Sequence, residues 1–516
     1  MLWRWTPLAW LAIGCSSATT GPDQTTPTDA PTSTITDPVA DCAARVTASE
    51  VVDTTTITAL ELALELSEPA AVWAVCTAEG DPAEQLLVEA GAVVGSHRLD
   101  LVGLLPATTY TCEVHPACAD SESTPVSVEV PALPGGVPTL TATGTPSAPF
   151  HAFNAQGGFA LSDRQLVLVA DDLGRVRWGY NLGVGYRADV DVTWTGTGMH
   201  MGGGWGLFEE NIEQRGLMLE VALDGTVRFD HRSPLYGIGY NHHSEPMPDG
   251  TVLSLTTSRD EGDGRSWHGV AVERRDPLSD ELTWSWSSQA MFDAGQVQAQ
   301  GNNSSPWHAN SVRWRTDSLG DALWVSLYVG QAMWRIDRDT GLRTHELTAS
   351  GGDFTWQDAD GNPLPPEERV YAQHDPDYTT DGRVLLYDNG VDRPGGNQSR
   401  VVELELDLEE NVATLLWSWT EEDWYTQILG DADYLPSGNV LVTKGVVRIL
   451  DFFGDQPSAL IEVSPTTDEV AWRLELEEGF TVFRAQQIGG CDIFAHAGYC
   501  PEVADRIATL TALSGD

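Results

Sequence analysis

The sequence predicts an all-β protein in which a small β-sandwich precedes a six-bladed β-propeller. The 516 residues include 50 Gly and 19 Trp, a composition that favours turn-rich β structure over helical bundles. From about residue 148 a pattern recurs in which a strand and a Gly or Asp turn lead to a closing strand that usually carries tryptophan. Six such units begin near residues 155, 189, 242, 308, 374 and 431, and a β repeat of this length is typical of a propeller.

The repeat is clearest in three segments, which begin at His242, His374 and Gly430. In each of them a turn glycine follows eight residues after the first position, and a short apolar strand follows the turn. A propeller gathers the first strands of its units around a central channel, so equivalent positions in the repeat face one another there. We therefore assign the propeller to residues 148–516.

The N-terminus is predicted to be a lipoprotein signal over residues 1–15. Arg4 gives it a positive start, and the apolar run at 8–13 is too short to span a bilayer. The run ends in Ala-Ile-Gly-Cys, which resembles a bacterial lipobox, and lipid on Cys15 would anchor the chain to a membrane. An ordinary secretory signal with a chance cysteine is the alternative. Residues 16–39, rich in Thr, Pro and Ser, are expected to form a disordered tether.

The remaining cysteines predict disulfides and no metal site. They are even in number, and an exported chain favours their oxidation. A zinc site is the alternative, but the sequence contains no Cys-x-x-Cys pair. The six cysteines expected to pair are Cys42, Cys76, Cys112, Cys118, Cys491 and Cys500.

Residues 40–133 are predicted to form the sandwich. Apolar and polar residues alternate over 56–66, as in a half-buried strand. The run Leu104-Leu105-Pro106-Ala107-Thr108-Thr109-Tyr110 resembles the fibronectin type III signature, in which the tyrosine forms a tyrosine corner. A spacer or packing role is expected for this domain, and residues 131–138 form the linker that leaves it.

The charge balance excludes some partners. Lys and Arg number 28 against 76 Asp and Glu, a formal charge of −48. Such a surface repels nucleic acid and anionic lipid, so neither is expected as a partner. A pocket for an anionic substrate must therefore supply its own local donor groups.

Three histidines supply such donors. His242, His308 and His374 open three successive units, each 66 residues from the next. Histidines at the starts of propeller strands also serve as structural caps, and this is the alternative for each of them taken alone. Three at equivalent positions favour a functional pocket.

Seven short motifs occur in order around these histidines: His242-His243, His308-Ala309-Asn310-Ser311, Gln373-His374-Asp375, Leu386-Tyr387-Asp388-Asn389-Gly390, Ser399-Arg400-Val401-Val402-Glu403, Gly438-Asn439-Val440-Leu441-Val442-Thr443 and Phe483-Arg484-Ala485. As an ordered set over roughly residues 150–490, they are similar to the motifs of the arylsulfotransferase family.

The resemblance implies a six-bladed propeller that moves a sulfuryl group from a phenolic sulfate ester to a phenol, without a phosphoadenosine cofactor. It implies that His374 is the nucleophile that forms a sulfohistidine, and that His242 and His308 stabilise the transferred group. Asn310 would donate a further hydrogen bond, and Thr443 would lie at the pocket wall. A neutral imidazole is a competent nucleophile near neutral pH.

One position departs from the family pattern. Tyr328 stands where the pattern has an arginine that helps to bind the sulfate, and tyrosine donates one hydrogen bond and carries no positive charge. Arg393 is the candidate to replace that arginine. Tyr328 favours a second hypothesis, a non-catalytic propeller that binds a ligand or partner at the cell surface. A third is a hydrolase that passes the sulfuryl group to water.

The residue that follows the lipobox, Ser16, favours anchoring of the chain in the outer membrane, on its periplasmic or its surface face.

Overall fold

The computed structural model describes residues 42–118, 121–157, 165–183, 190–204, 216–232, 239–301, 305–379, 381–446 and 457–514. The predicted signal, Cys15 and the tether lie outside these residues. The described chain is all-β, with two α-helices, α1 (Gln289–Asp293) and α2 (Pro501–Ser514), and one 3-10 helix, η1 (Pro366–Glu368). None of these helices is long and apolar enough to cross a membrane.

The N-terminal domain contains five strands in one hydrogen-bonded sheet. The strands are β1 (Val46–Asp53), β2 (Leu60–Ala78), β3 (Asp81–Leu101), β4 (Thr109–Pro116) and β5 (Thr124–Glu129). Their order in the sheet is β1-β2-β4-β5, in which β1 pairs with the first half of β2 and β4 with its second half. β3 pairs with both halves of β2. Side chains from all five strands contribute to one apolar core, because alternate residues of a strand face the same side.

The disulfide bonds predicted for this domain and for the C-terminal segment are present. Cys42 pairs with Cys118 and Cys76 with Cys112, and in the C-terminal segment Cys491 pairs with Cys500. The hydroxyl of Tyr110 accepts a hydrogen bond of 3.0 Å from the Leu105 amide, the contact that a tyrosine corner makes. The fibronectin type III relation itself stays a prediction.

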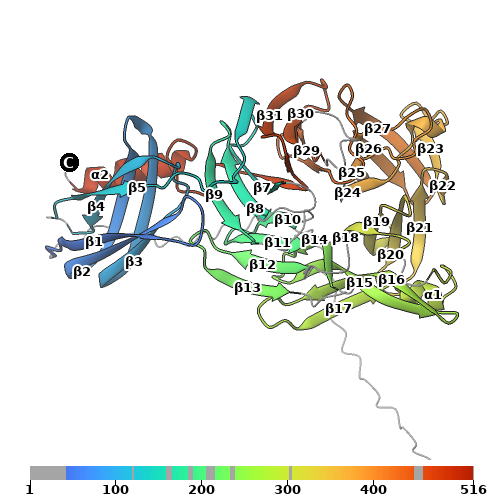
Figure 1. The fold of residues 1–516 in the computed structure, drawn as a ribbon, viewed down its shortest axis with the longest axis horizontal. Helices are drawn as coiled ribbons and strands as arrows, with labels where there is room; N and C mark the ends of the chain where they lie inside the picture. Colours follow the sequence, from blue (N-terminus) through green and yellow to red (C-terminus); the bar gives the residue numbers. More distant parts are fainter. Residues whose placement is uncertain are drawn as a thin grey trace, which may run out of the picture. The chain divides into compact units, whose positions relative to one another are not determined.

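Six further sheets follow, which we number sheet 1 to sheet 6 (Figure 1). Sheet 1 contains β7 (Phe150–Gly157), β8 (Gln165–Asp171), β9 (Val176–Asn181), β32 (Phe480–Thr481) and β33 (Ala485–Ile488). Sheet 2 contains β10 (Val190–Trp194), β11 (Met199–Gly203), β12 (Leu217–Val221) and β13 (Val227–Arg232). Sheet 3 contains β14 (Tyr240–Pro246), β15 (Val252–Gly262), β16 (Arg265–Arg275) and β17 (Leu282–Ser287).

The remaining three sheets have five strands each. Sheet 4 contains β18 (Ala309–Asp317), β19 (Gly320–Leu327), β20 (Ala332–Asp337), β21 (Arg343–Thr348) and β22 (Gly351–Gly352). Sheet 5 contains β23 (Thr355–Asp358), β24 (Gln373–Tyr378), β25 (Arg383–Asp388), β26 (Arg400–Asp407) and β27 (Val412–Trp419). Sheet 6 contains β28 (Asp431–Tyr434), β29 (Val440–Lys444), β30 (Ala459–Val463), β31 (Val470–Leu476) and β6 (Leu140–Gly144).

The first strands of successive sheets contact one another, in the order β7, β10, β14, β18, β24 and β28. Two pairings join the ends of this series: β6, from before sheet 1, pairs with β31 of sheet 6, and β33, from after sheet 6, pairs with β7 of sheet 1. The turn glycines of the repeat, Gly250, Gly382 and Gly438, have φ of 84°, 87° and 86°. A side chain is strained at such angles, which explains why the repeat keeps glycine there.

The closing tryptophans of the repeat have a common contact. Each donates its indole N–H to the turn before the closing strand of the next sheet: Trp178 to Leu223 O (2.8 Å), Trp286 to Gly341 O (2.8 Å), Trp417 to Asp468 Oδ1 (2.8 Å) and Trp472 to Asp172 O (3.0 Å). Sheets 2 and 4 use an imidazole instead, through contacts from His231 to Pro277 O (2.6 Å) and from His345 to Leu408 O (3.1 Å). All six junctions, including that from sheet 6 back to sheet 1, therefore carry a bond of the same kind.

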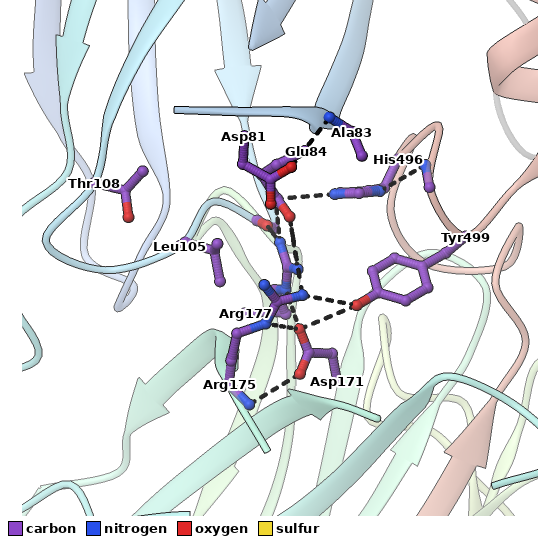
Figure 2. A network of polar contacts seen from close by, with 12 residues as sticks. Asp81, Ala83, Glu84, Leu105, Thr108, Asp171, Arg175, Arg177, His496 and Tyr499 are labelled. Carbon is purple, nitrogen blue, oxygen red and sulfur yellow. Dashed lines mark hydrogen bonds and ion pairs between the residues drawn. The ribbon is translucent and has the colours of Figure 1, made fainter. Parts of the chain in front are cut away.

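A buried polar network joins the N-terminal domain to sheet 1 (Figure 2). Glu84 of β3 accepts hydrogen bonds from Arg177 of β9 (Nη2 to Oε2, 3.0 Å) and from the Tyr110 hydroxyl (3.1 Å). Its Oε1 lies 2.9 Å from His496 Nε2. The Nδ1 of His496 accepts the Gly498 amide proton, so Nε2 is the ring nitrogen that faces Glu84.

The C-terminal segment completes this junction. Ala495 and Ala497 form backbone bonds with β3, and the Cys491–Cys500 disulfide closes the loop that carries them. Helix α2 then packs Leu510 on the N-terminal sheet, and Arg506 donates to Glu89 of β3 (2.7 Å).

Candidate active site

The structure brings the three predicted histidines together. His242 lies in β14, His308 directly before β18 and His374 in β24, which are the first strands of sheets 3, 4 and 5. The Nε2 atoms of His242 and His308 lie 3.1 Å apart, which is hydrogen-bond distance. The ring of Tyr328 has its centroid 6.0 Å from that of His308 and 5.3 Å from that of His374, so this tyrosine lies close to both rings. Their roles as site residues stay a prediction.

The backbone at this site is strained. His242 and His308 have φ of 50° and 43°, in the left-handed region that side chains other than glycine rarely adopt. Such a conformation costs about 1 to 3 kcal/mol per residue and is frequent at functional sites.

All three imidazoles are neutral at pH 7. Burial lowers the pKa of His308 to about 4 and that of His374 to about 3. Burial, together with the neighbouring His308, holds the pKa of His242 well below its usual value. A neutral ring keeps one unprotonated nitrogen, so His374 retains a lone pair for attack.

The ring of His374 is held by Asn389, which follows β25. Its Nδ1 lies 2.6 Å from Asn389 Oδ1. The amide Nδ2 of Asn389 in turn donates to the carbonyl oxygens of Thr426 and Leu429, both at 2.9 Å. Asp375, the charged residue that follows His374 in the sequence, makes no hydrogen bond to this ring among the described residues.

Asp375 instead belongs to a charge network. Its carboxylate lies 3.1 Å from Arg313 Nη2 and 3.1 Å from Arg484 Nε. Arg484 also donates to Asp191 Oδ2 (2.8 Å) and to the Asn310 carbonyl (2.9 Å). Burial raises the pKa of Asp375, but the two guanidinium groups outweigh it and hold this pKa below its usual value. The buried cations are therefore balanced by carboxylates.

The other predicted residues are placed as follows. Asn310 in β18 donates its Nδ2 to the Gln373 carbonyl (2.7 Å), directly before His374. The Tyr328 hydroxyl donates to the Gln427 carbonyl (2.9 Å), and burial raises its pKa. Thr443 is buried in β29, where it pairs with Asp431 of β28.

Arg393 was the candidate to replace the missing arginine, and this interpretation was wrong. Its guanidinium donates to Asp388 Oδ2 (2.5 Å) and to the carbonyl oxygens of Glu367 (3.1 Å) and Arg369 (2.9 Å). It therefore holds the turn after β25 in place.

Two residues of the site were missed as site residues, although their motifs were recognised. Asn389 belongs to the Asp-Asn-Gly element and Arg484 to the Phe-Arg-Ala element. Phe483 was missed as well; its ring lies 6.0 Å from that of His242, and it packs with Leu429 and Ile428. Phe483, Leu429 and Ile428 therefore form a small apolar cluster beside His242.

The fold and the site define a repeat-built, all-β protein with a buried cluster of neutral imidazoles at the starts of successive sheets. A family model described as Arylsulfotransferase (ASST) matches residues 149–484, which is more than half of the chain and includes all three histidines. The chain therefore belongs to the arylsulfotransferase family.

Other comparisons add no functional information. No curated protein matches the chain. Among solved structures, a putative 6-phosphogluconolactonase from Bacteroides uniformis ATCC 8492 shares 10% identity with a TM-score of 0.37, over 82% of this chain and 100% of that one. A europium-containing methanol dehydrogenase shares 10% identity with a TM-score of 0.32, over 88% of this chain and 83% of that one.

Proposed function

We propose that this chain is an aryl sulfotransferase that needs no phosphoadenosine cofactor and forms a sulfohistidine at His374. The observation that carries the proposal is the arrangement of this residue: a buried, neutral imidazole whose Nδ1 is bonded to Asn389, in a cluster with two more imidazoles. Membership of the family supports the reaction class.

We propose that sheets 1 to 6 are the blades of a closed six-bladed propeller. Six equivalent bonds between neighbouring sheets support this count, because the last of them leads from Trp472 in sheet 6 to Asp172 before β9 of sheet 1. The pairings of β6 with β31 and of β33 with β7 support closure from both ends of the chain. The histidines would then lie around the central channel.

In the first half-reaction, the Nε2 lone pair of His374 attacks the sulfur of an aryl sulfate. The N–S bond forms, the S–O bond to the aryl oxygen breaks, and the electron pair leaves with the phenolate. His242 and His308 donate hydrogen bonds to the sulfuryl oxygens or to the leaving oxygen, where charge develops. Asn310 is assigned a further hydrogen bond in this step, and Thr443 a place at the pocket wall.

In the second half-reaction, a phenol oxygen attacks the sulfur of the sulfohistidine. The new O–S bond forms, the N–S bond breaks, and the lone pair returns to Nε2, while the phenol proton passes to solvent. Two displacements at one nucleophile give ping-pong kinetics.

The test uses purified protein and 4-nitrophenyl sulfate, with and without phenol, and follows both nitrophenol release and the mass of the His374 peptide. Phenol-dependent release, with a sulfuryl adduct on this peptide that His374→Ala abolishes, is the expected result. Release that does not depend on phenol would instead assign a hydrolase.

A second candidate function is a non-catalytic propeller that binds a ligand or protein partner. Tyr328 favours it, because an uncharged side chain whose hydroxyl already donates to Gln427 stands where the family has a sulfate-binding arginine. If the test shows no nitrophenol release and no sulfuryl adduct, that result would support this second function.

The proposed location is the cell envelope, with a lipid anchor on Cys15. The three disulfides fit an exported protein, since such bonds persist in oxidising compartments. Metabolic labelling with a fatty-acid analogue tests the anchor, and Cys15→Ser is expected to abolish the label.

A further inference from the structure

We propose that Asn389 is a positioning residue that fixes the proton of His374 on Nδ1, and that its lack of charge keeps the sulfuryl group on His374 transferable. The proposal rests on the proposed function, because it assigns a role within the same site. Asn389 is fully buried and touches the nucleophile on the side opposite to the reacting Nε2.

The bonds of Asn389 determine which way its amide faces. The carbonyl oxygens of Thr426 and Leu429 can only accept hydrogen bonds, so the atom 2.9 Å from both of them is the amide nitrogen. Both N–H groups are then engaged, and Oδ1 is the atom that faces His374. Because this oxygen can only accept, the proton of the imidazole must lie on Nδ1, and the lone pair on Nε2.

This arrangement also affects the intermediate. Once Nε2 carries the sulfuryl group and Nδ1 keeps its proton, the ring bears a positive charge. A carboxylate partner would stabilise this charge through a hydrogen bond roughly twice as strong as a neutral one, and would thereby make the N–S bond harder to break. A neutral amide stabilises the ring enough to form the intermediate and leaves it reactive toward the acceptor phenol.

The neighbouring carboxylate is kept away from the ring. Asp375 directly follows His374, but Arg313 and Arg484 hold its oxygens, each at 3.1 Å. The charge network thus removes the one adjacent group that could replace Asn389 as a charged partner of the nucleophile.

The first test reads the tautomer of His374 in the full-length protein without substrate. In protein labelled with ¹⁵N-histidine, the expected spectrum shows a protonated Nδ1 and an unprotonated Nε2, and His374→Gln identifies the signals among those of the 12 histidines. A proton on Nε2 would overturn the proposal.

The second test compares two substitutions that act differently on the bond. Asn389→Leu removes the acceptor, so we expect a mixture of tautomers and about 10- to 100-fold slower formation of the sulfuryl enzyme. Asn389→Asp keeps an acceptor and adds charge, so we expect the Nδ1 proton to remain, and transfer to phenol to slow about 10-fold while sulfohistidine accumulates.

Ser399→Ala is the matched control, because it loosens the same loop without touching the imidazole. Ser399 Oγ donates to the Asn389 carbonyl (3.0 Å) and accepts from the Thr426 amide (2.8 Å). We expect the wild-type tautomer in this variant. Two results would overturn the proposal. One is that Asn389→Leu has the same His374 tautomer and the same rate of sulfuryl-enzyme formation as the wild type. The other is that Asn389→Asp transfers the sulfuryl group to phenol at the normal rate.

The two levels of the proposal fail separately. If no sulfuryl group is ever transferred, the proposed function fails, while the tautomer in the substrate-free protein still tests the positioning by Asn389. If Asn389→Leu does not fold, the wild-type spectrum and Asn389→Asp still decide.

Discussion

Neutralising Glu84 is expected to weaken the junction between the N-terminal domain and sheet 1. This carboxylate is 3% exposed, and its partners Arg177 and His496 are 0% and 3% exposed. In Glu84→Gln the buried guanidinium of Arg177 loses one of its two charged partners among the described residues and keeps the other, Asp171. Removing one member of a buried pair costs about 3 to 5 kcal/mol, because the other charge stays buried without full compensation.

The matched control is Glu61→Gln at the surface of the same domain. Glu61 pairs with Arg98, whose side chain is 72% exposed. Exposed pairs contribute about 0 to 1 kcal/mol. The free energy of unfolding, measured by urea titration of both variants and the wild type, should therefore separate them clearly.

The pH dependence gives a second check on Glu84. Burial raises the pKa of Glu84, but the hydrogen bonds from His496 and Arg177 outweigh it, and the pKa lies well below its usual value. Its contribution is then fully present above the unfolded pKa of about 4.3 and is lost as the pH falls through the lower folded pKa. This reasoning would be refuted if Glu84→Gln lowered the free energy of unfolding no more than Glu61→Gln does. It would also be refuted if the difference in this free energy between Glu84→Gln and the wild type did not shrink below pH 4.

Three further outcomes are expected. Because the pKa values of His374 and His308 are about 3 and about 4, the rate of sulfuryl-enzyme formation, followed by stopped flow, should stay level from pH 8 to about pH 5, whereas an ordinary imidazole loses half its nucleophile near pH 6.5. Tyr328→Phe should change kcat/KM for 4-nitrophenyl sulfate by less than about fivefold, because the hydroxyl donates to Gln427, while Tyr328→Arg should raise it about 10-fold. The net charge of −48 predicts a Tm that rises from 10 to 100 mM NaCl, as the screening length falls from about 30 to about 10 Å; sucrose of equal osmolality is the control.

The repeat was visible in the sequence, but the contact that each repeated residue makes in the structure was not. Closing tryptophans were visible as a pattern, yet their role, an N–H donated to the turn of the next sheet, depends on which sheets become neighbours. His231 and His345 fill the same position with a different ring. Their side chains do not resemble tryptophan in size or hydropathy, so only the shared contact shows that they are equivalent.

The spacing predicted that the three histidines occupy equivalent positions, but it did not predict the hydrogen-bond partner of His374. Asp375 is adjacent to His374 in the sequence and charged, yet the ring is bonded to Asn389. The pairing of β24 with β25 is irregular after His374, where Asp375 has a φ of 36°, and its carboxylate lies 3.1 Å from Arg484 Nε. Asn389 reaches the ring from the end of β25, because Gln373 and His374 pair in register with Asp388 and Tyr387.

The neutrality of the site follows from the reaction that we propose. An aryl sulfate and a phenol become a phenol and an aryl sulfate, so one negative charge is present before and after transfer. A site for such an exchange needs hydrogen-bond donors that hold one anion without themselves gaining or losing a proton. Imidazoles whose pKa values are held far below 7 meet that need, and the paired charges of Arg313 and Arg484 with their carboxylates leave it undisturbed. A site of this kind can operate in a chain of net charge −48, because it depends on fixed hydrogen-bond donors at short range rather than on long-range attraction.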